Sequence, residues 1–512
     1  MTWLLPLPVM VPLVAAGLAL AVSRRTRAQG IISISALTIV LGVAVALIFV
    51  THTDGPQVMG VGDWQVPVGI GLVADRLSAL MLVVSALVLL GVLAYSLAQG
   101  LADGHESAPV AIYHPTYLVL AAGVSMAFLS GDLFNLYVGF EILLAASFVL
   151  LTLGGTGERI RAGSIYVVVS LLSSILFLIS IALIYAATGT LNMAHLAERL
   201  GEVDSGVRLL LQIMLLLGFA IKAAVFPLSA WLPDSYPTAP APVTAVFAGL
   251  LTKVGVYAII RAQTLLFPDS PLNTVLLVAA IATMLVGIIG AVAQEDIKRL
   301  LSFTLVSHIG YMIFGIALSS ETGLSASIFY IVHHITVQTA LFLIAGLVER
   351  RGGTTSLEQL GSLAKVAPAL GAVFFLSAMN LAGIPPMSGF LGKVGLLQAG
   401  FQDGSPLALV GVGAGLLTSL LTLYAVVKAW NKAFWQEAPE PLPDARVPRT
   451  MFGPAAAIAS VGVLIAVIGG PLYAYTDAAA RDLTARDPYV DAVLVYGDRG
   501  SGQSSDAGGG DG

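Results

Sequence analysis

The sequence predicts an all-α, polytopic membrane protein with about fourteen transmembrane helices. Three observations lead to this prediction: 57% of the 512 residues are hydrophobic, only 10% are charged, and the mean hydropathy is +0.92. A chain of this composition is solvated mainly by lipid, so we expect membrane lipid to be its first partner.

The composition also excludes several classes of function. The chain contains no cysteine, which rules out disulfides, thiolate metal sites and a cysteine nucleophile. We expect no metal and no cofactor. The net charge of −5 is modest, and the basic residues lie in short clusters between apolar runs. This pattern gives no electrostatic footprint for nucleic acid, which we do not expect as a partner.

Each predicted span is an apolar run of about 20 residues, the length that a helix needs to cross the hydrocarbon core. The spans are 3–22, 30–50, 72–98, 112–130, 133–153, 162–187, 206–226, 240–261, 271–292, 299–318, 323–348, 367–400, 405–430 and 452–475. The first run has no basic segment before it, which is typical of a retained helix rather than a cleaved signal peptide. The Gly-, Ser- and Asp-rich end of the chain predicts a disordered, exposed tail over 478–512.

The loops between these spans predict the orientation, because cytoplasmic loops carry an excess of Lys and Arg. One side holds fourteen basic residues: Arg24, Arg25, Arg27, Arg159, Arg161, Lys298, Arg299, Arg350, Arg351, Lys365, Lys428, Lys432, Arg446 and Arg449. The other side holds seven: Arg76, Arg199, Arg208, Arg261, Arg481, Arg486 and Arg499. An even number of spans then places both termini on the outer side of the cell membrane.

Ionisable residues inside the predicted spans are the main candidates for function. Lys222, Lys253 and Lys393 lie within spans, and Glu141 has no residue of opposite charge in its own span. A charge at mid-bilayer costs about 2.5–3.5 kcal/mol even on insertion scales, so such residues indicate an ion pathway unless they only hold helices together.

Histidines add to this set. A polar stripe at three- and four-residue spacing runs along one predicted helix and consists of Ser327, Tyr330, His334 and Gln338. Such a stripe either lines a wet path or joins helices by hydrogen bonds. His333 faces elsewhere, and His308 lies near the end of its span, so both are accessory candidates together with Gln338.

Two spans carry breaks, each within eight residues of a buried lysine. The first break contains Pro227, Pro233, Pro237, Pro240 and Pro242, and the second contains Gly383, Pro385 and Pro386. Proline frees helix carbonyls, which is tolerated at membrane depth only where protein or a wet cavity satisfies them. Paired broken helices mark ion pathways in transporters with internal repeats. Asp234, within the first break, is a further accessory candidate.

These residues suggest a mechanism for proton transfer. A lysine beside Glu141 would hold its proton, and one deprived of that partner would release it, because burial disfavours the charged form. Lys222, Lys253, His334 and Lys393, joined by ordered water, could then pass a proton laterally.

Four stretches carry a resemblance to a known family: DLFNLYVGFEILLAASFVLLTLGG, IKAAVFPLSAWLPDSYPTAPAPVTAVFAGLLTKVGVY, LLSFTLVSHIGYMIFGIAL and LAGIPPMSGFLGKVGLLQAG. They resemble the proton-translocating family shared by Mrp-type sodium/proton antiporters and the antiporter-like membrane subunits of respiratory complex I. The resemblance covers residues from about 70 to 435 and implies fourteen helices with two inverted five-helix repeats and two broken helices.

The resemblance also implies a division of the chain and roles for single residues. Residues 1–110 would be N-terminal helices, 111–262 and 263–435 the two repeats, and 436–477 the last span. Glu141 and Lys222 match the family's carboxylate–lysine pair, Lys253 its central lysine, His334 its relay residue and Lys393 its terminal lysine. Relatives often carry a lysine where this chain has Gln338, so titration on that helix would depend on the histidines.

The function implied is that of a secondary transporter subunit, not an enzyme. It would move protons, and Na⁺ with them, within a hetero-oligomeric Mrp antiporter. The main alternative is a proton-pumping subunit of complex I, although one such homologue has a glutamate where Lys393 stands here. A structural scaffold whose charges only hold helices together, and a transporter for an organic solute, are further alternatives.

Overall fold

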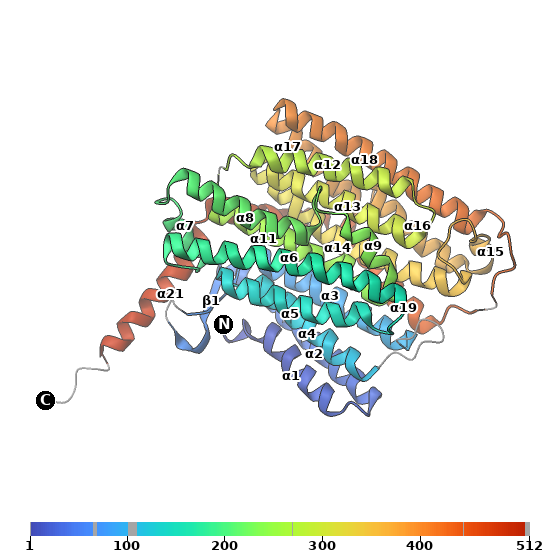
Figure 1. Ribbon diagram of the computed structural model, residues 1–512, viewed down its shortest axis with the longest axis horizontal. Coiled ribbons are helices and arrows are strands. Elements are labelled where there is room, and N and C mark those ends of the chain that lie inside the picture. The colour runs from blue at the N-terminus through green and yellow to red at the C-terminus, as the bar shows by residue number, and fades with distance from the viewer. Residues whose placement is uncertain (1, 65–68, 101–109, 269, 444, 507–512) are drawn as a thin grey trace.

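The structure of the protein, a computed structural model, describes residues 2–64, 69–100, 110–268, 270–443 and 445–506. Long helices lie side by side in one bundle, with their axes running across the view in Figure 1. A short antiparallel hairpin, β1 (Gln57–Gly60) and β2 (Gly71–Ala74), pairs Gln57 with Ala74 and Gly60 with Gly71.

The elements follow the order of the predicted spans. The helices before the middle of the chain are α1 (Leu7–Ala21), α2 (Thr26–Thr53), α3 (Arg76–Gln99), α4 (Val110–Leu129), α5 (Leu133–Thr152), α6 (Gly157–Thr188), α7 (Met193–Arg199), α8 (Ser205–Ala223), α9 (Trp231–Ser235), α10 (Ala241–Val246) and α11 (Thr252–Arg261). Those after it are α12 (Asn273–Val292), α13 (Ile297–Ala317), α14 (Glu321–Gly352), α15 (Leu363–Val366), α16 (Pro368–Ala382), α17 (Ser388–Asp403), α18 (Pro406–Trp430), α19 (Arg449–Val467), α20 (Gly469–Ala485) and α21 (Asp487–Asp506). Single turns of 3₁₀-helix are η1 (Thr2–Leu4), η2 (Val61–Asp63) and η3 (Tyr236–Thr238), and π-helical turns are η4 (Phe247–Leu251), η5 (Ala262–Leu266) and η6 (Asn431–Trp435).

The predicted all-α membrane fold is confirmed. Within the described residues, thirteen helices are long and apolar enough to cross a membrane, and α10, η4, α11 and η5 together form one of them. The predicted span 367–400 corresponds to α16 followed by α17, which have 15 and 16 residues. Each of these two is about 24 Å long at 1.5 Å per residue, so they cross the roughly 30 Å core only as a broken pair.

The centre of the bundle is formed by α14 and by the continuous helix over 241–266. Nearly every residue of α14 between Gly323 and Val348 is buried, whichever way its side chain points. A helix that is apolar all round belongs in an interior. By contrast, α6 exposes Val168 and Ile175, at 66% and 56%, on the outside of the bundle. The ionisable groups of the central helices are therefore shielded from lipid by other helices.

Both predicted breaks are present. The first begins where α8 ends at Ala223, and the backbone N–H of Phe226 beyond it donates to Thr283 Oγ1 at 3.0 Å. The carbonyl of Ile221, in the last turn of α8, also accepts from Trp231 Nε1 at 3.2 Å. The second begins at Gly383, whose φ of 84° ends α16 in the left-handed region that glycine tolerates.

The prediction of a disordered tail from residue 478 is wrong for the part that the structure describes. Residues 478–506 belong to α20 and α21. Asp482 forms an ion pair with Arg76, and Arg486 Nη2 donates to the carbonyl of Ala197 at 2.7 Å. Tyr489 is buried as well. These contacts with distant segments order the helices, and residues 507–512 lie outside the described part.

The two ends of the described chain lie toward the same end of the bundle. The start of α1, the strand β1, α7 and α21 are all on the left in Figure 1, whereas α15 lies on the right. We refer to the opposite end, where α6 and α13 begin and α14 ends, as the arginine-rich end, because Arg159, Arg299 and Arg351 lie at these helix ends. The even number of crossings that the sequence predicts agrees with this arrangement.

Candidate functional site

Glu141 and Lys222 meet through a serine hydroxyl. Glu141 lies in the middle of α5, Lys222 is the penultimate residue of α8, and Ser174 of α6 lies between them. The Ser174 hydroxyl donates to Glu141 Oε1 and accepts from Lys222 Nζ at 3.2 Å. Lys222 Nζ also donates to the carbonyl of Ser170 at 3.2 Å. The partner that the sequence demanded for Glu141 therefore comes from another span, with a hydroxyl as the bridge.

A small cavity lies beside Lys222. It has a volume of ≈20 Å³ and is lined by Lys222, Ser170, Tyr166 and Tyr236 together with apolar side chains. A cavity of about 10–15 Å³ or more holds one water if polar groups surround it. The ring of Phe140 faces the ammonium group from 6.0 Å. The cavity is thus large enough for one water next to the lysine.

Lys253 is fully enclosed at the start of α11. Its exposed fraction is 0%, and its Nζ donates to the carbonyl of Ala248 at 2.5 Å. That carbonyl belongs to the π-helical turn η4, and π-turns inside α-helices occur frequently at functional sites. A Cβ on Gly249 would lie 2.3 Å from Thr339 Oγ1, so η4 packs closely against α14.

His308 of α13 and His334 of α14 form what we call the histidine group, which joins these two helices. The rings of His308 and His334 lie 5.2 Å apart, and His308 Nδ1 is 2.9 Å from the Tyr330 hydroxyl. His308 Nε2 is 3.3 Å from Thr422 Oγ1. Among the described residues, neither ring nitrogen of His334 has a hydrogen-bond partner, although the side chain is fully buried. Such a ring can exchange protons with a water more readily than one whose nitrogens are both engaged.

The polar stripe of α14 mainly contacts α13. Ser327 donates to the carbonyl of Met312 at 2.8 Å, and Gln338 Nε2 donates to that of Leu301 at 2.7 Å. At these two positions the stripe joins helices, the alternative to a wet path that the sequence left open. Its His334 position differs, because there no helix partner occupies the ring nitrogens in the described chain.

His333 points away from this stripe, as the helical spacing predicts, and faces the second break. Its Nδ1 lies 2.9 Å from Ser388 Oγ at the start of α17. Ser388 in turn donates to Asn380 Oδ1 at 3.1 Å and to the carbonyl of Gly462 at 2.9 Å. His333 is therefore part of the polar contacts that hold the broken helix.

Lys393 binds the broken end of α16. Its Nζ donates to the carbonyls of Leu381 and Ala382 at 3.2 and 2.8 Å and to Ser419 Oγ at 3.1 Å. These carbonyls have no helical partner at a helix C-terminus, where the macrodipole also favours a cation. The ring of Tyr311, which faces the ammonium group from 5.3 Å, lies 5.7 Å from the His308 ring. Aromatic and histidine rings thus connect Lys393 with His334.

Asp234 is not close to the buried residues. Its side chain is 57% exposed at the arginine-rich end and pairs with Arg299 at 3.2 Å. The structure consequently joins Glu141 to Lys222 and, separately, the histidine group to Lys393, but leaves this accessory candidate at the surface.

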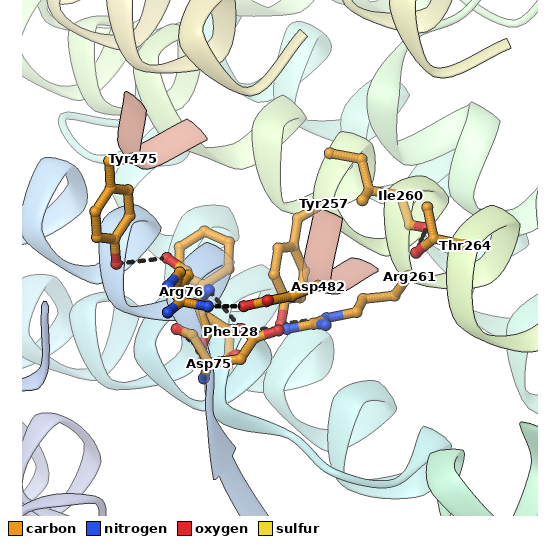
Figure 2. A network of polar contacts seen from close by, with 10 residues as sticks. Asp75, Arg76, Phe128, Tyr257, Ile260, Arg261, Thr264, Tyr475 and Asp482 are labelled. Carbon is orange, nitrogen blue, oxygen red and sulfur yellow. Dashed lines mark hydrogen bonds and ion pairs between the residues drawn. The ribbon is translucent and has the colours of Figure 1, made fainter. Parts of the chain in front are cut away.

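Sequence reasoning missed a second buried ion pair. Arg261, which the sequence places in a loop, ends α11 inside the protein and pairs with Asp75 at 2.6 Å (Figure 2). Burial raises the pKa of Asp75, but the guanidinium charge and hydrogen bonds from Arg261 and Ser78 outweigh it and hold the pKa below its usual range. Tyr257 donates to the carbonyl of Phe128 at 2.7 Å and accepts from Arg261 Nε at 3.0 Å.

Comparisons with known proteins agree with this arrangement. The family described as NADH:quinone oxidoreductase/Mrp antiporter, TM, matches residues 130–422. The D component of the Na(+)/H(+) antiporter of Alkalihalophilus pseudofirmus is 39% identical over 495 residues, which cover 95% of this chain and 98% of that protein. The corresponding antiporter component of Bacillus subtilis is 37% identical, with 95% and 98% covered. Among solved structures, a chain of the Mrp complex from Dietzia sp. DQ12-45-1b covers 96% of this chain and 100% of its own length, with a TM-score of 0.90 and 35% identity.

Proposed function

Because the chain belongs to the NADH:quinone oxidoreductase/Mrp antiporter transmembrane family, we propose that it is the proton-translocating subunit of a multisubunit Na⁺/H⁺ antiporter. The observation that carries this proposal is that the bridged pair of Glu141 and Lys222, Lys253, the histidine group and Lys393 all lie inside one bundle of membrane-spanning helices. These groups lie on six different helices and contact hydroxyls, carbonyls and rings inside the bundle. Charges that merely anchored helices to the membrane surface would not need such contacts.

The chemistry of the buried row formed by Lys222, Lys253, His334 and Lys393 suits proton transfer. Lys253 and Lys393 donate hydrogen bonds to neutral carbonyl and hydroxyl oxygens. Loss of a proton from either lysine therefore leaves no buried carboxylate without its positive partner. Burial disfavours the charged form of Lys222, and the nearby carboxylate of Glu141 opposes that effect. A proton that reaches Lys222 can move on when the pair separates, and Lys253, His334 and Lys393 follow as its next positions.

Assembly with partner subunits fits the position of the first pair. Glu141 and Lys222 are only half-buried, at the side of the bundle formed by α5, α6 and α8. Lipid on that side would impose a desolvation cost that a neighbouring subunit removes. The Dietzia relative comes from an Mrp complex, and we propose the same kind of assembly here. The alternative of a complex I subunit is less favoured, because the relatives from Alkalihalophilus and Bacillus are both antiporter subunits.

We also propose the orientation and the division into repeats. The arginine-rich end would face the cytoplasm and both termini the outside, in the cell membrane. The two halves would be 111–262 and 263–435, flanked by 1–110 and by 436–477. Each half would contribute one broken helix with its lysine, Lys222 at the first break and Lys393 at the second.

Replacing Glu141 tests the proposal. Glu141→Ala in the assembled complex should abolish cation/proton exchange in membrane vesicles, since Lys222 loses the charge that retains its proton. Glu198→Gln, an exposed carboxylate on α7, serves as the control and should leave exchange unchanged. Full exchange by a folded, assembled Glu141→Ala complex would reject the pair as the switch. Unchanged transport in Lys222→Gln and Lys253→Gln complexes would favour a structural scaffold instead.

A further inference from the structure

A short segment separates the Lys222 cavity from a large space at the arginine-rich end. This space, which we call the vestibule, has a volume of ≈600 Å³. Its lining includes Arg159, Asp234, Pro237, Thr238, Lys298 and Arg299. The side chains of Asp234 and Arg299 are 57% and 44% exposed, so the vestibule reaches the surface. It is therefore a wet region between ion-paired side chains.

The separating segment runs through α9 and η3. Residues on either side of Tyr236, namely Asp234 and Pro237, line the vestibule, whereas Trp231 and Tyr236 line the cavity that holds Lys222. The segment is fixed in place, because Arg159 Nε donates to the carbonyl of Thr238 at 3.2 Å. Tyr236 thus lines the Lys222 cavity and belongs to a segment whose neighbouring residues line the vestibule.

The Tyr236 side chain has an unusual environment. It is completely buried, and within the described chain its hydroxyl has no hydrogen-bond partner. Its ring packs on Trp231 at 5.6 Å and on Phe247 at 5.5 Å. A phenylalanine at this position would pack against the same rings. A buried hydroxyl without a hydrogen-bond partner, by contrast, lowers the stability of the folded protein. Packing alone does not explain why the residue is a tyrosine.

We propose that the hydroxyl of Tyr236 relays protons between the vestibule and Lys222. This inference depends on the proposed function, because it needs Lys222 to be a proton acceptor. The hydroxyl can donate and accept at once. In one transfer, Tyr236 gives its proton to a water in the cavity, that water gives one of its own to the neutral Lys222 amine, and a vestibule water restores the hydroxyl. One proton moves inward: the Tyr236 hydroxyl and the cavity water return to their starting states, Lys222 becomes an ammonium group, and a hydroxide ion is left in the vestibule.

The variant Tyr236→Phe removes the hydroxyl alone and tests the inference. Exchange by the intact antiporter complex in vesicles should fall by about a hundredfold, the lower end of what a positioned proton-transfer group contributes. The exchange rate should also slow more in D₂O than it does for the unaltered complex, because proton uptake becomes the limiting step. Thermal stability should be retained or raised, since no hydrogen bond is lost.

Tyr489→Phe is the matched control. Tyr489 of α21 is also buried with a hydroxyl that has no partner among the described residues, but its ring packs on Arg261, away from the cavity. This variant should exchange at the original rate. Unaltered exchange by Tyr236→Phe, with Lys222→Gln inactive, would overturn the inference and leave the proposed function intact. Unaltered exchange by both Tyr236→Phe and Lys222→Gln would overturn the two together.

Discussion

The buried lysines differ in what holds them. Lys222 has a carboxylate one hydroxyl away, whereas Lys253 and Lys393 donate to neutral oxygens and Lys393 also faces an aromatic ring. A buried charge without an opposite charge is costly and favours the neutral form. Burial therefore favours the neutral form of Lys253 and Lys393 without opposition from a carboxylate, whereas at Lys222 the charge of Glu141 opposes the effect of burial.

Ser174 should prove as important as the charged residues that it connects. Ser174→Ala removes hydrogen bonds to charged groups at both ends, and a net loss of about 2 kcal/mol in stabilisation of the transfer step corresponds to a factor of about 30 in rate. We expect cation/proton exchange in vesicles to slow by about that factor. Ser173→Ala is the control on the same helix, because Ser173 donates only to the carbonyl of Gly218, at 2.8 Å. Equal loss in both variants would show that the hydroxyl bridge has no special role.

The ion pair between Asp75 and Arg261 should matter for stability. Its side chains are 6% and 4% exposed, and removal of one partner from such a pair costs about 3–5 kcal/mol because the other charge stays buried. Asp75→Asn should therefore lower the melting temperature of the purified complex strongly. Arg76→Gln, which breaks the more exposed pair with Asp482, should cost about 1 kcal/mol or less.

The same pair sets a pH dependence. The pKa of Asp75 is lowered in the folded protein from an ordinary value of 3.8, so its stabilising contribution is present above that value and is lost as the pH falls further through the folded pKa. The difference in melting temperature between the original protein and Asp75→Asn should be constant near neutral pH and shrink only below about 4. A difference that shrinks already between pH 7 and 5 would contradict this assignment.

At the scale of elements, the second broken helix depends on how closely Lys393 approaches Gly383. A Cβ on Gly383 would lie 2.9 Å from Lys393 Cδ, and the φ of 84° disfavours any other residue. Gly383→Ala should displace the ammonium group from the α16 carbonyls and largely abolish exchange. Gly404, at φ 69° after α17, is the control, since its nearest neighbour would be 3.9 Å away.

The two glycines separate backbone strain from displacement of the lysine. Gly404→Ala should cost only the left-handed strain of about 1–2 kcal/mol and keep the exchange rate. Melting temperatures of both variants measure the strain, and exchange in vesicles measures the displacement. Similar exchange rates in the two variants would show that the Lys393 contact is dispensable.

Elements with a local signal can be predicted from the sequence, and those held by distant contacts cannot. Apolar runs and prolines locate the spans and both breaks, including the one after Gly383. The prediction of a disordered tail fails because it depends on the composition of the last Gly- and Ser-rich residues, which hides the apolar residues around Tyr489. In addition, the partner of Asp482 lies 406 residues away in the sequence. Ser174 gives no signal among the several serines of α6. Arg261 reads as a loop residue because its partner, Asp75, lies 186 residues away in the sequence.

For the whole molecule, the distribution of basic residues between the two ends of the bundle predicts the side of the membrane from which protons enter the buried row. Arg261, one of the seven basic residues that the sequence assigns to the end with the termini, is buried in α11. Six basic residues remain at that end, and fourteen lie at the other. The larger asymmetry favours a cytoplasmic location for the arginine-rich end. The vestibule beside Tyr236 would then open to the cytoplasm and collect protons there.

Cysteine labelling tests this orientation without background from the chain itself, which has no cysteine. Glu202→Cys, exposed between α7 and α8, should react with a membrane-impermeant maleimide in intact cells. Lys365→Cys, whose native side chain is 70% exposed on α15, should react only in inverted vesicles or permeabilised cells. The opposite labelling pattern would reverse the orientation, and with it the side from which the vestibule takes up protons, while the order of groups from Tyr236 to Lys393 would stay the same.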